Sequence, residues 1–136
     1  MAEAVAEGIH AEDGETEVKL FNIAEGDKND VITEIFRAKG VLLGSPTINK
    51  GILTAMAALL EEAKGLGFEK KKAAGFGCYG WSGESVAILT EQLKAAGFET
   101  VDGGLKALWN PDEEALEAAR QYGRNFAKQF EPVPVE

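Results

Sequence analysis

Residues 73–84 read AAGFGCYGWSGE, and this stretch decides how the rest of the chain is interpreted. Its first half, Ala73 to Cys78, is short, apolar and rich in small residues, which is typical of a strand covered on both faces. Its second half is a glycine-rich turn that contains Tyr79 and Trp81. Two aromatic side chains in a strand-to-helix loop contribute little to packing, whereas a flat π-system ligand would stack on them. The stretch therefore predicts a buried strand that leads into a ligand-binding loop.

A second stretch of the same kind, VLLGSPTINKG, occupies residues 41–51. Its apolar start, Val41 to Gly44, predicts another buried strand. In the loop that follows, Ser45, Thr47 and Asn49 supply hydroxyl and amide groups, while Pro46 stiffens the turn. Ligands of open parallel sheets lie beyond the carboxyl ends of the strands. The two loops together predict one binding site, although either loop alone fits an ordinary connection equally well.

The remaining segments alternate between the two kinds of secondary structure. Residues 1–9, 27–36, 52–63 and 86–96 predict helices with one apolar face. Thr16 to Phe21 and Phe98 to Val101 alternate polar and apolar residues, which predicts two edge strands. Alternating strands and helices indicate an α/β fold with a parallel sheet. We therefore expect a single domain over residues 1–136, with three layers, four strands and helices on both faces of the sheet.

The last helix has the clearest predicted start. Asn110 serves as its N-cap, Pro111 takes the first helical position, and Glu113 completes a capping box. Trp109 lies just before this start and has two interpretations. It covers the face of a bound ring, or it forms a hydrophobic staple with the helix, and the staple is the more ordinary of the two.

Composition excludes several classes of function. The formal net charge is −9 and the pI is about 4.7, so the field of the chain repels nucleic acids and acidic membrane surfaces. Cys78 is the only cysteine and His10 the only histidine, which argues against disulfides, zinc or iron–sulfur ligand sets and a Ser/His/Asp triad. The acidic start lacks the features of a signal peptide, and no apolar run is long enough to span a membrane. We expect a soluble protein of the cytoplasm.

The loops GSPTINKG and FGCYGWSGES, together with the closing PDEEAL helix, resemble one known family. They are similar to the flavodoxin-like domain of flavodiiron proteins, the A-type flavoproteins, over nearly the whole chain. The resemblance implies noncovalent binding of FMN. It also implies electron transfer to a diiron centre in a partnering domain or protein, with rubredoxin or a flavin reductase as the electron donor.

The resemblance also implies which residues meet the flavin. Ser45, Pro46, Thr47 and Asn49 would line one edge of the isoalloxazine ring. The residues beside or over the ring would come from the second loop, and they are Cys78, Tyr79, Gly80, Trp81, Ser82 and Gly83. Cys78 departs from the family, in which a serine is usual, and its ordinary interpretation is a small, buried and unreactive residue. No catalytic or metal-binding residue is expected.

The family opens with an apolar strand and a hydroxyl-rich loop that holds the FMN phosphate, and no such segment occurs in this sequence. We therefore expect a domain that is truncated at its N-terminus relative to the family. Flavodoxin-like sheets have the strand order 2-1-3-4-5, so the absent strand is an interior one. The strand at Thr16 to Phe21 must then pair directly with Val41 to Gly44, borrow a strand from another chain, or leave an interior edge open.

Three functions follow from these observations. The first is an FMN-dependent electron-transfer domain of flavodiiron type, without an autonomous active site. The second is a cofactor-free structural remnant whose sheet is completed by an identical chain in a homodimer. The third, and weakest, is an NADPH-dependent flavin reductase. Whether FMN binds without the phosphate loop is the question that separates the first function from the second.

Overall fold

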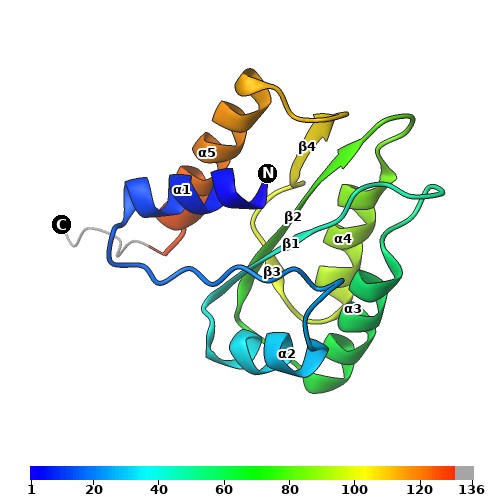
Figure 1. Cartoon of the computed structure of the whole chain (residues 1–136). Coiled ribbons are helices and arrows are strands. Elements are labelled where there is room, and N and C mark those ends of the chain that lie inside the picture. Colours follow the sequence, from blue (N-terminus) through cyan, green and yellow to red (C-terminus); the bar gives the residue numbers. More distant parts are fainter. Residues whose placement is uncertain (131–136) are drawn as a thin grey trace. The chain divides into compact units, whose positions relative to one another are not determined.

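A computed structural model of the chain describes residues 1–130. Contacts divide the chain into two compact units, each described separately below. One unit joins Met1–Leu20 to the chain from Pro111 onward, and the other is Phe21–Asn110. Figure 1 labels the elements of both. No helix within residues 1–130 is long and apolar enough to cross a bilayer.

The unit Phe21–Asn110 is built on a parallel sheet with β2 (Lys72–Tyr79) at its centre. On one side, β2 pairs with β1 (Gly40–Gly44) along the whole length of the shorter strand. On the other side, it pairs first with β3 (Glu99–Thr100) and then with β4 (Leu105–Leu108). The predicted parallel sheet is confirmed, and so are the strands predicted at 41–44 and 73–78.

One predicted strand is absent, and one observed strand was not predicted. Thr16 to Phe21 forms no strand, because it has no strand partner among the described residues, and Leu20 and Phe21 are 54% and 45% exposed. Conversely, β4 was not predicted, since Leu105–Leu108 shows neither alternation nor a long apolar run. The strand predicted at Phe98 to Val101 is shorter than expected, with only Glu99–Thr100 in the ladder.

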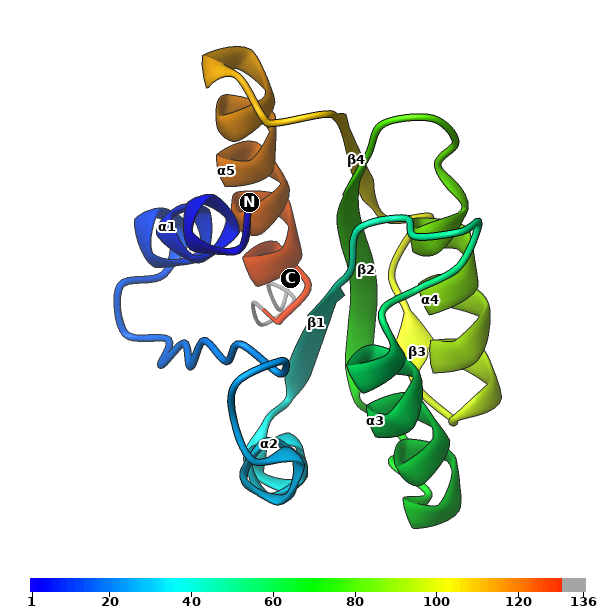
Figure 2. The same cartoon turned by 45° about the vertical axis from the view of Figure 1, so that its right-hand side comes forward.

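Three helices belong to this unit, namely α2 (Lys28–Arg37), α3 (Thr54–Leu66) and α4 (Glu84–Ala95). Either Asp27 or Asp30 could cap α2 on the sequence, and the structure has Asp27, whose side chain accepts a hydrogen bond from the N–H of Asn29. Figure 2 shows α3 and α4 running side by side along the sheet. The core lies between these helices and the strands, and its most deeply buried large side chains include Leu59, Leu60, Val86, Leu89 and Leu93.

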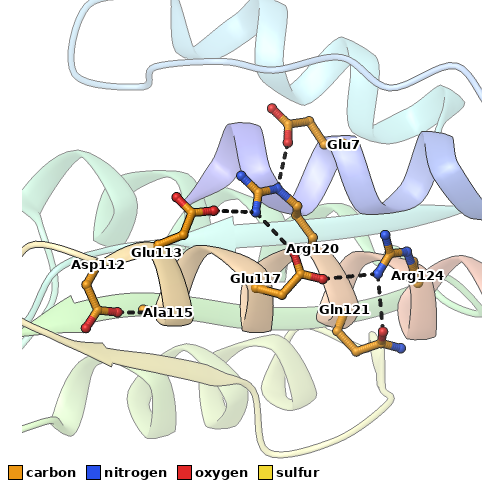
Figure 3. Close-up of polar contacts among 8 residues, drawn as sticks. All are labelled: Glu7, Asp112, Glu113, Ala115, Glu117, Arg120, Gln121 and Arg124. Carbon is orange, nitrogen blue, oxygen red and sulfur yellow. Dashed lines mark hydrogen bonds and ion pairs between the residues drawn. The ribbon is translucent and has the colours of Figure 1, made fainter.

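The second unit contains α1 (Ala2–Glu12) and α5 (Glu113–Lys128). Gly8 and Gly123 let the two helices approach closely, since a Cβ on either glycine would collide with a carbonyl oxygen of the other helix. Figure 3 shows how Arg120 of α5 joins them, by pairing with Glu7 of α1 at 2.9 Å and with Glu113 and Glu117 of its own helix. These carboxylates, Glu7 first, raise the pKa of Arg120 further above its ordinary value.

The predicted start of α5 was wrong by two residues. Asp112 is the N-cap, and its carboxylate accepts a hydrogen bond from the N–H of Ala115 at 2.8 Å (Figure 3). Asn110 and Pro111 precede the helix instead of opening it. Aspartate and asparagine are equally good N-caps, so residue type alone does not choose between Asp112 and Asn110. The helix begins after Asp112.

Candidate functional site

Three loops leave the sheet at the same edge, because β1, β2 and β4 are parallel and end together. They are residues 45–53 after β1, 80–83 after β2 and 109–110 after β4. The first two were predicted to form the site, and all three belong to the unit Phe21–Asn110. This edge is where the fold gathers backbone and aromatic groups that no regular element uses.

Ser45 closes the first loop from inside. It is only 2% exposed, and its hydroxyl donates to the carbonyl oxygen of Pro46 at 2.9 Å while accepting from the N–H of Leu53 at 3.0 Å. Both ends of the loop are therefore tied through one side chain. The hydroxyl holds the loop in shape rather than facing outward to a ligand.

Thr47 joins the first loop to the second. Its N–H donates to the carbonyl oxygen of Cys78 at 3.1 Å, and its Oγ1 accepts from the N–H of Ser85, in the first turn of α4, at 3.1 Å. An N–H in the first turn of a helix lacks an intrahelical partner, so this bond caps α4 with a residue from another loop. The two predicted loops are thus brought into direct contact.

Asn49 and Lys50 form the tip of the first loop. Both have left-handed backbones, with φ of 50° and 62°, and Ile48 and Gly51 exchange hydrogen bonds of 3.1 and 2.8 Å around them. Asparagine tolerates this conformation better than most residues, which explains its presence at the tip. The side chains of Asn49 and Lys50 are exposed, and so is Pro46 earlier in the loop.

The second loop presents unused backbone donors. The N–H groups of Gly80, Trp81, Ser82 and Gly83 form no hydrogen bond with any residue within 1–130. Trp81 is 95% exposed, and Tyr79 is partly exposed beside it. A row of free N–H groups between two aromatic side chains can bind oxygen or nitrogen acceptors at the rim of a planar ligand.

Trp109 is a site residue that the sequence did not place in the site. Its N–H donates to the carbonyl oxygen of Tyr79 at 2.7 Å, and its indole ring lies against Gly80. A Cβ at Gly80 would approach the indole carbon Cζ3 to 2.7 Å, so a larger residue there would displace the indole. The proximity of a second tryptophan to the YGWSG turn was the available signal, and the preferred staple interpretation set it aside.

Two ionisable groups at this edge have shifted pKa values. The Ser82 hydroxyl, followed by the residue's own N–H and by Lys50 and Lys106, lowers the pKa of Glu84 below its ordinary value. Burial raises the pKa of the Cys78 thiol. Glu84 is therefore an anion and Cys78 a neutral thiol at pH 7. Cys78 is thus not poised as a nucleophile.

The geometry at this edge suits a flat aromatic ligand rather than a metal ion. Within residues 1–130, no group of three or more His, Cys, Asp or Glu side chains is placed to hold a metal. A cavity of about 300 Å³ lies elsewhere in this unit, between α3 and α4, and of the two predicted loops only Gly51 lines it. That cavity has neither the free N–H row nor the aromatic side chains, so the edge with the three loops is the better candidate.

Comparison with known proteins identifies relatives for most of the chain. Residues 1–123 match the Flavodoxin family. The anaerobic nitric oxide reductase flavorubredoxin of Klebsiella pneumoniae is 48% identical over 137 residues, which cover 99% of this chain and 28% of that protein. Its counterpart in Aliivibrio fischeri is 47% identical over 135 residues, with 99% and 27% covered. The chain therefore spans little more than a quarter of the length of these curated relatives.

Solved structures agree in fold. The flavodiiron protein of Giardia intestinalis aligns with a TM-score of 0.88 at 27% identity, over 94% of this chain and 32% of that one. Rubredoxin:oxygen oxidoreductase of Desulfovibrio gigas gives 0.87 at 33% identity, with 94% and 31% covered. An archaeal flavodoxin gives 0.83 at 26% identity, with 94% and 86% covered.

Proposed function

Because the chain belongs to the flavodoxin family, we propose that it is an electron-transfer module that binds FMN noncovalently and relays electrons to a diiron partner. FMN is the cofactor of this family, and when bound it supplies the one- and two-electron redox chemistry that amino-acid side chains lack. The residues of the chain bind the flavin, orient it and set its electrostatic surroundings.

The observation that carries this proposal is the row of free N–H groups at residues 80–83, flanked by Tyr79 and Trp81. The rim of an isoalloxazine ring carries carbonyl oxygens and ring nitrogens that accept such hydrogen bonds. Its flat face matches the exposed Trp81 indole. Ser45 and Thr47 support this arrangement from behind, since their hydroxyls lock the first loop onto the second.

Electrostatics at the site favour a relay over acid–base catalysis. Glu84 is held as an anion, and Cys78 as a neutral thiol, throughout the neutral range. Neither group is poised to donate or accept a proton near pH 7. Both belong to the surroundings that set the reduction potential of the flavin.

The names of the relatives support the electron partners that we propose. Curated relatives are flavorubredoxins, and a structural relative is a rubredoxin:oxygen oxidoreductase. We propose rubredoxin or a flavin reductase as the donor and a diiron domain as the acceptor. Since the chain covers only 28% of the Klebsiella relative, the nitric oxide chemistry in that protein's name would require residues beyond this chain.

One observation favours a second candidate function, in which the sheet pairs with an identical chain. The N–H of Lys72 donates to the carbonyl oxygen of Lys39, and the N–H of Ser45 donates to that of Phe76. The backbone N–H and C=O groups of odd-numbered residues along β1 therefore point toward β2. Those of Gly40, Leu42 and Gly44 face the other way and have no backbone partner within residues 1–130. A short, uncharged edge of this kind is a template for strand pairing. Sedimentation over a range of concentrations would detect the homodimer, and a monomer at all concentrations would exclude it.

Titration with FMN tests the leading proposal, with Trp81→Ala as the informative variant. Wild type should bind saturably and shift the visible absorption of the flavin. Trp81→Ala should bind about 2- to 10-fold more weakly, because one stacking face is lost, and should unfold at the same temperature because Trp81 is 95% exposed. Absence of saturable binding by wild type would reject the proposal for this chain.

A further inference from the structure

Trp109 holds its position at a conformational cost. Its φ of 53° places a large side chain in the left-handed region, where bulky residues are rare. Strain of this kind persists only where neighbouring groups enforce it, and it concentrates at functional positions. Because the side chain remains 64% exposed, burial in a core does not compensate for the strain.

The groups that enforce the strain lie at the end of β2 and in the second loop. The N–H of Trp109 donates to Tyr79 O at 2.7 Å, and the indole covers Gly80 so closely that a Cβ would lie 2.7 to 3.1 Å from three of its carbons. The two contacts fix the backbone on both sides of the peptide bond that joins Tyr79 to Gly80. That peptide bond carries the first of the four free N–H groups.

Trp109 does not lie at the position that a hydrophobic staple requires. A hydrophobic staple joins the residue before the N-cap to the fourth helical residue. The N-cap of α5 is Asp112, so the staple position belongs to Pro111. Trp109 lies two residues too early in the chain to take that part.

We propose that Trp109 is a positioning residue of the ring site, whose indole clamps Gly80 and thereby aims the free N–H groups of residues 80–83 at the bound ring. This rests on the proposed function, because the ring in question is the flavin. Trp109 acts through the backbone of the turn, whereas Trp81 is the exposed tryptophan available to contact the ring directly.

A double-mutant cycle with lumiflavin, the flavin ring without a phosphate chain, tests this role. Trp109→Gly removes the indole and relieves the strained φ, and Gly80→Ala drives a Cβ into the indole. Each should weaken binding about tenfold. The double variant should also lose about tenfold, because both changes break one contact. A loss near 100-fold would mean independent effects, and unchanged binding in either single variant would overturn the proposal.

Stability separates positioning from a merely structural role. Trp109→Gly should unfold within a few degrees of wild type, since strain is removed and little surface is unburied. Trp109→Phe, which keeps an aromatic ring, should retain binding within about threefold. The control for Gly80→Ala is Gly103→Ala, because a Cβ at Gly103 would have nothing within 4 Å. That control should bind like wild type.

Two further readouts identify which proposal fails. In the ligand-free chain, the indole should shift the α-proton resonances of Gly80 upfield, and Trp109→Gly should abolish that shift. With flavin bound, Trp109→Gly should make the reduction potential more negative, because misdirected N–H groups stabilise the reduced ring less. An upfield shift without any lumiflavin binding by wild type would reject the proposed function. Normal lumiflavin binding and potential in Trp109→Gly would reject the role of Trp109 alone.

Discussion

Thr47 shows that the polar side chains of the site support the fold before any ligand arrives. Its N–H donates to the Cys78 carbonyl oxygen, and its hydroxyl oxygen accepts from the N–H of Ser85. Ser45 is engaged in the same way. That these residues line the flavin edge stays a prediction. If they do, the Ser45 hydroxyl contributes little to the ligand, because it already donates and accepts within the loop, whereas the Thr47 hydroxyl is left with its proton to donate.

Replacing Thr47 by Val keeps its shape and removes the acceptor that caps α4. We expect a loss of about 1 kcal/mol in the free energy of unfolding, which is typical of a removed N-terminal cap. Urea denaturation measures it. Thr33→Val is the matched control, because the Thr33 hydroxyl donates to the carbonyl oxygen of Asn29 at an exposed position of α2. The control should change stability by less than about 0.5 kcal/mol. Equal losses in the two variants would contradict the capping role of Thr47.

Cys78 should be unreactive at neutral pH. Burial raises the pKa of its thiol above the ordinary value of 9.0, so the thiolate that attacks reagents is scarce below that pH. Reaction with a disulfide reagent should be slow at pH 7 and should accelerate only above pH 9. Because the unfolded chain loses this proton first, the contribution of Cys78 to stability is complete below pH 9 and falls as the pH rises further. Rapid labelling at pH 7 would show that the thiol is activated.

At the scale of elements, β1 and β2 could be predicted because each is a continuous run of apolar and small residues. β4 could not, since Leu105–Leu108 becomes a strand only by pairing with residues 76–79 of β2. The strand predicted at Thr16 to Phe21 does not form, because the segment has the alternation of a strand but no partner among the described residues. Local pattern predicts a strand only when a neighbour is available to complete its hydrogen bonds.

The same reasoning explains the site. The two loops could be predicted, because glycine, proline, hydroxyl and aromatic residues after apolar runs are local signals. The part played by Trp109 could not, because its left-handed backbone and its contact with Gly80 arise from pairing between β4 and β2. The start of α5 was also misplaced, at Asn110 rather than Asp112, since both residues are good caps.

The crossing of α1 and α5 depends on Gly123. Gly123→Ala should lower the free energy of unfolding by about 1–3 kcal/mol, because the added Cβ meets the backbone of Val5 and must push the helices apart. Gly65→Ala is the control within α3, where a Cβ has nothing within 4 Å. It should raise stability by about 0.5–1 kcal/mol through helix propensity. Stabilisation by both substitutions would show that the close approach at Gly123 is not needed.

At the scale of the whole molecule, the proposed site accounts for the ring of the cofactor and assigns no group to its phosphate. Two helix N-termini are capped by aspartates, Asp27 and Asp112, and the first turn of α4 is capped by Thr47. The net charge of −9 opposes an anionic group further. The chain also spans only 28% of the Klebsiella flavorubredoxin. The property to test on this chain is therefore flavin binding, and the activity named for the longer relatives is not.

This imbalance predicts the relative affinity of two ligands. FMN and lumiflavin share the ring and differ in the phosphate-bearing chain. We expect this chain to bind FMN no more than about tenfold more tightly than lumiflavin, since a single charge-assisted hydrogen bond contributes about 1.5–3 kcal/mol and several would give far larger ratios. Paired equilibrium titrations measure the ratio. FMN binding more than 100-fold tighter would reveal a phosphate site.

The most direct measurement of the central claim is a lumiflavin titration of the wild-type chain, followed by stepwise reduction of the bound ring. We expect saturable binding, a shifted visible spectrum and a reduction potential different from that of free lumiflavin. Binding should also weaken in Trp81→Ala without a change in unfolding temperature. If lumiflavin leaves the spectrum unchanged at saturating concentration, or titrates with the potential of the free ring, the three loops do not form a flavin site and the account is wrong.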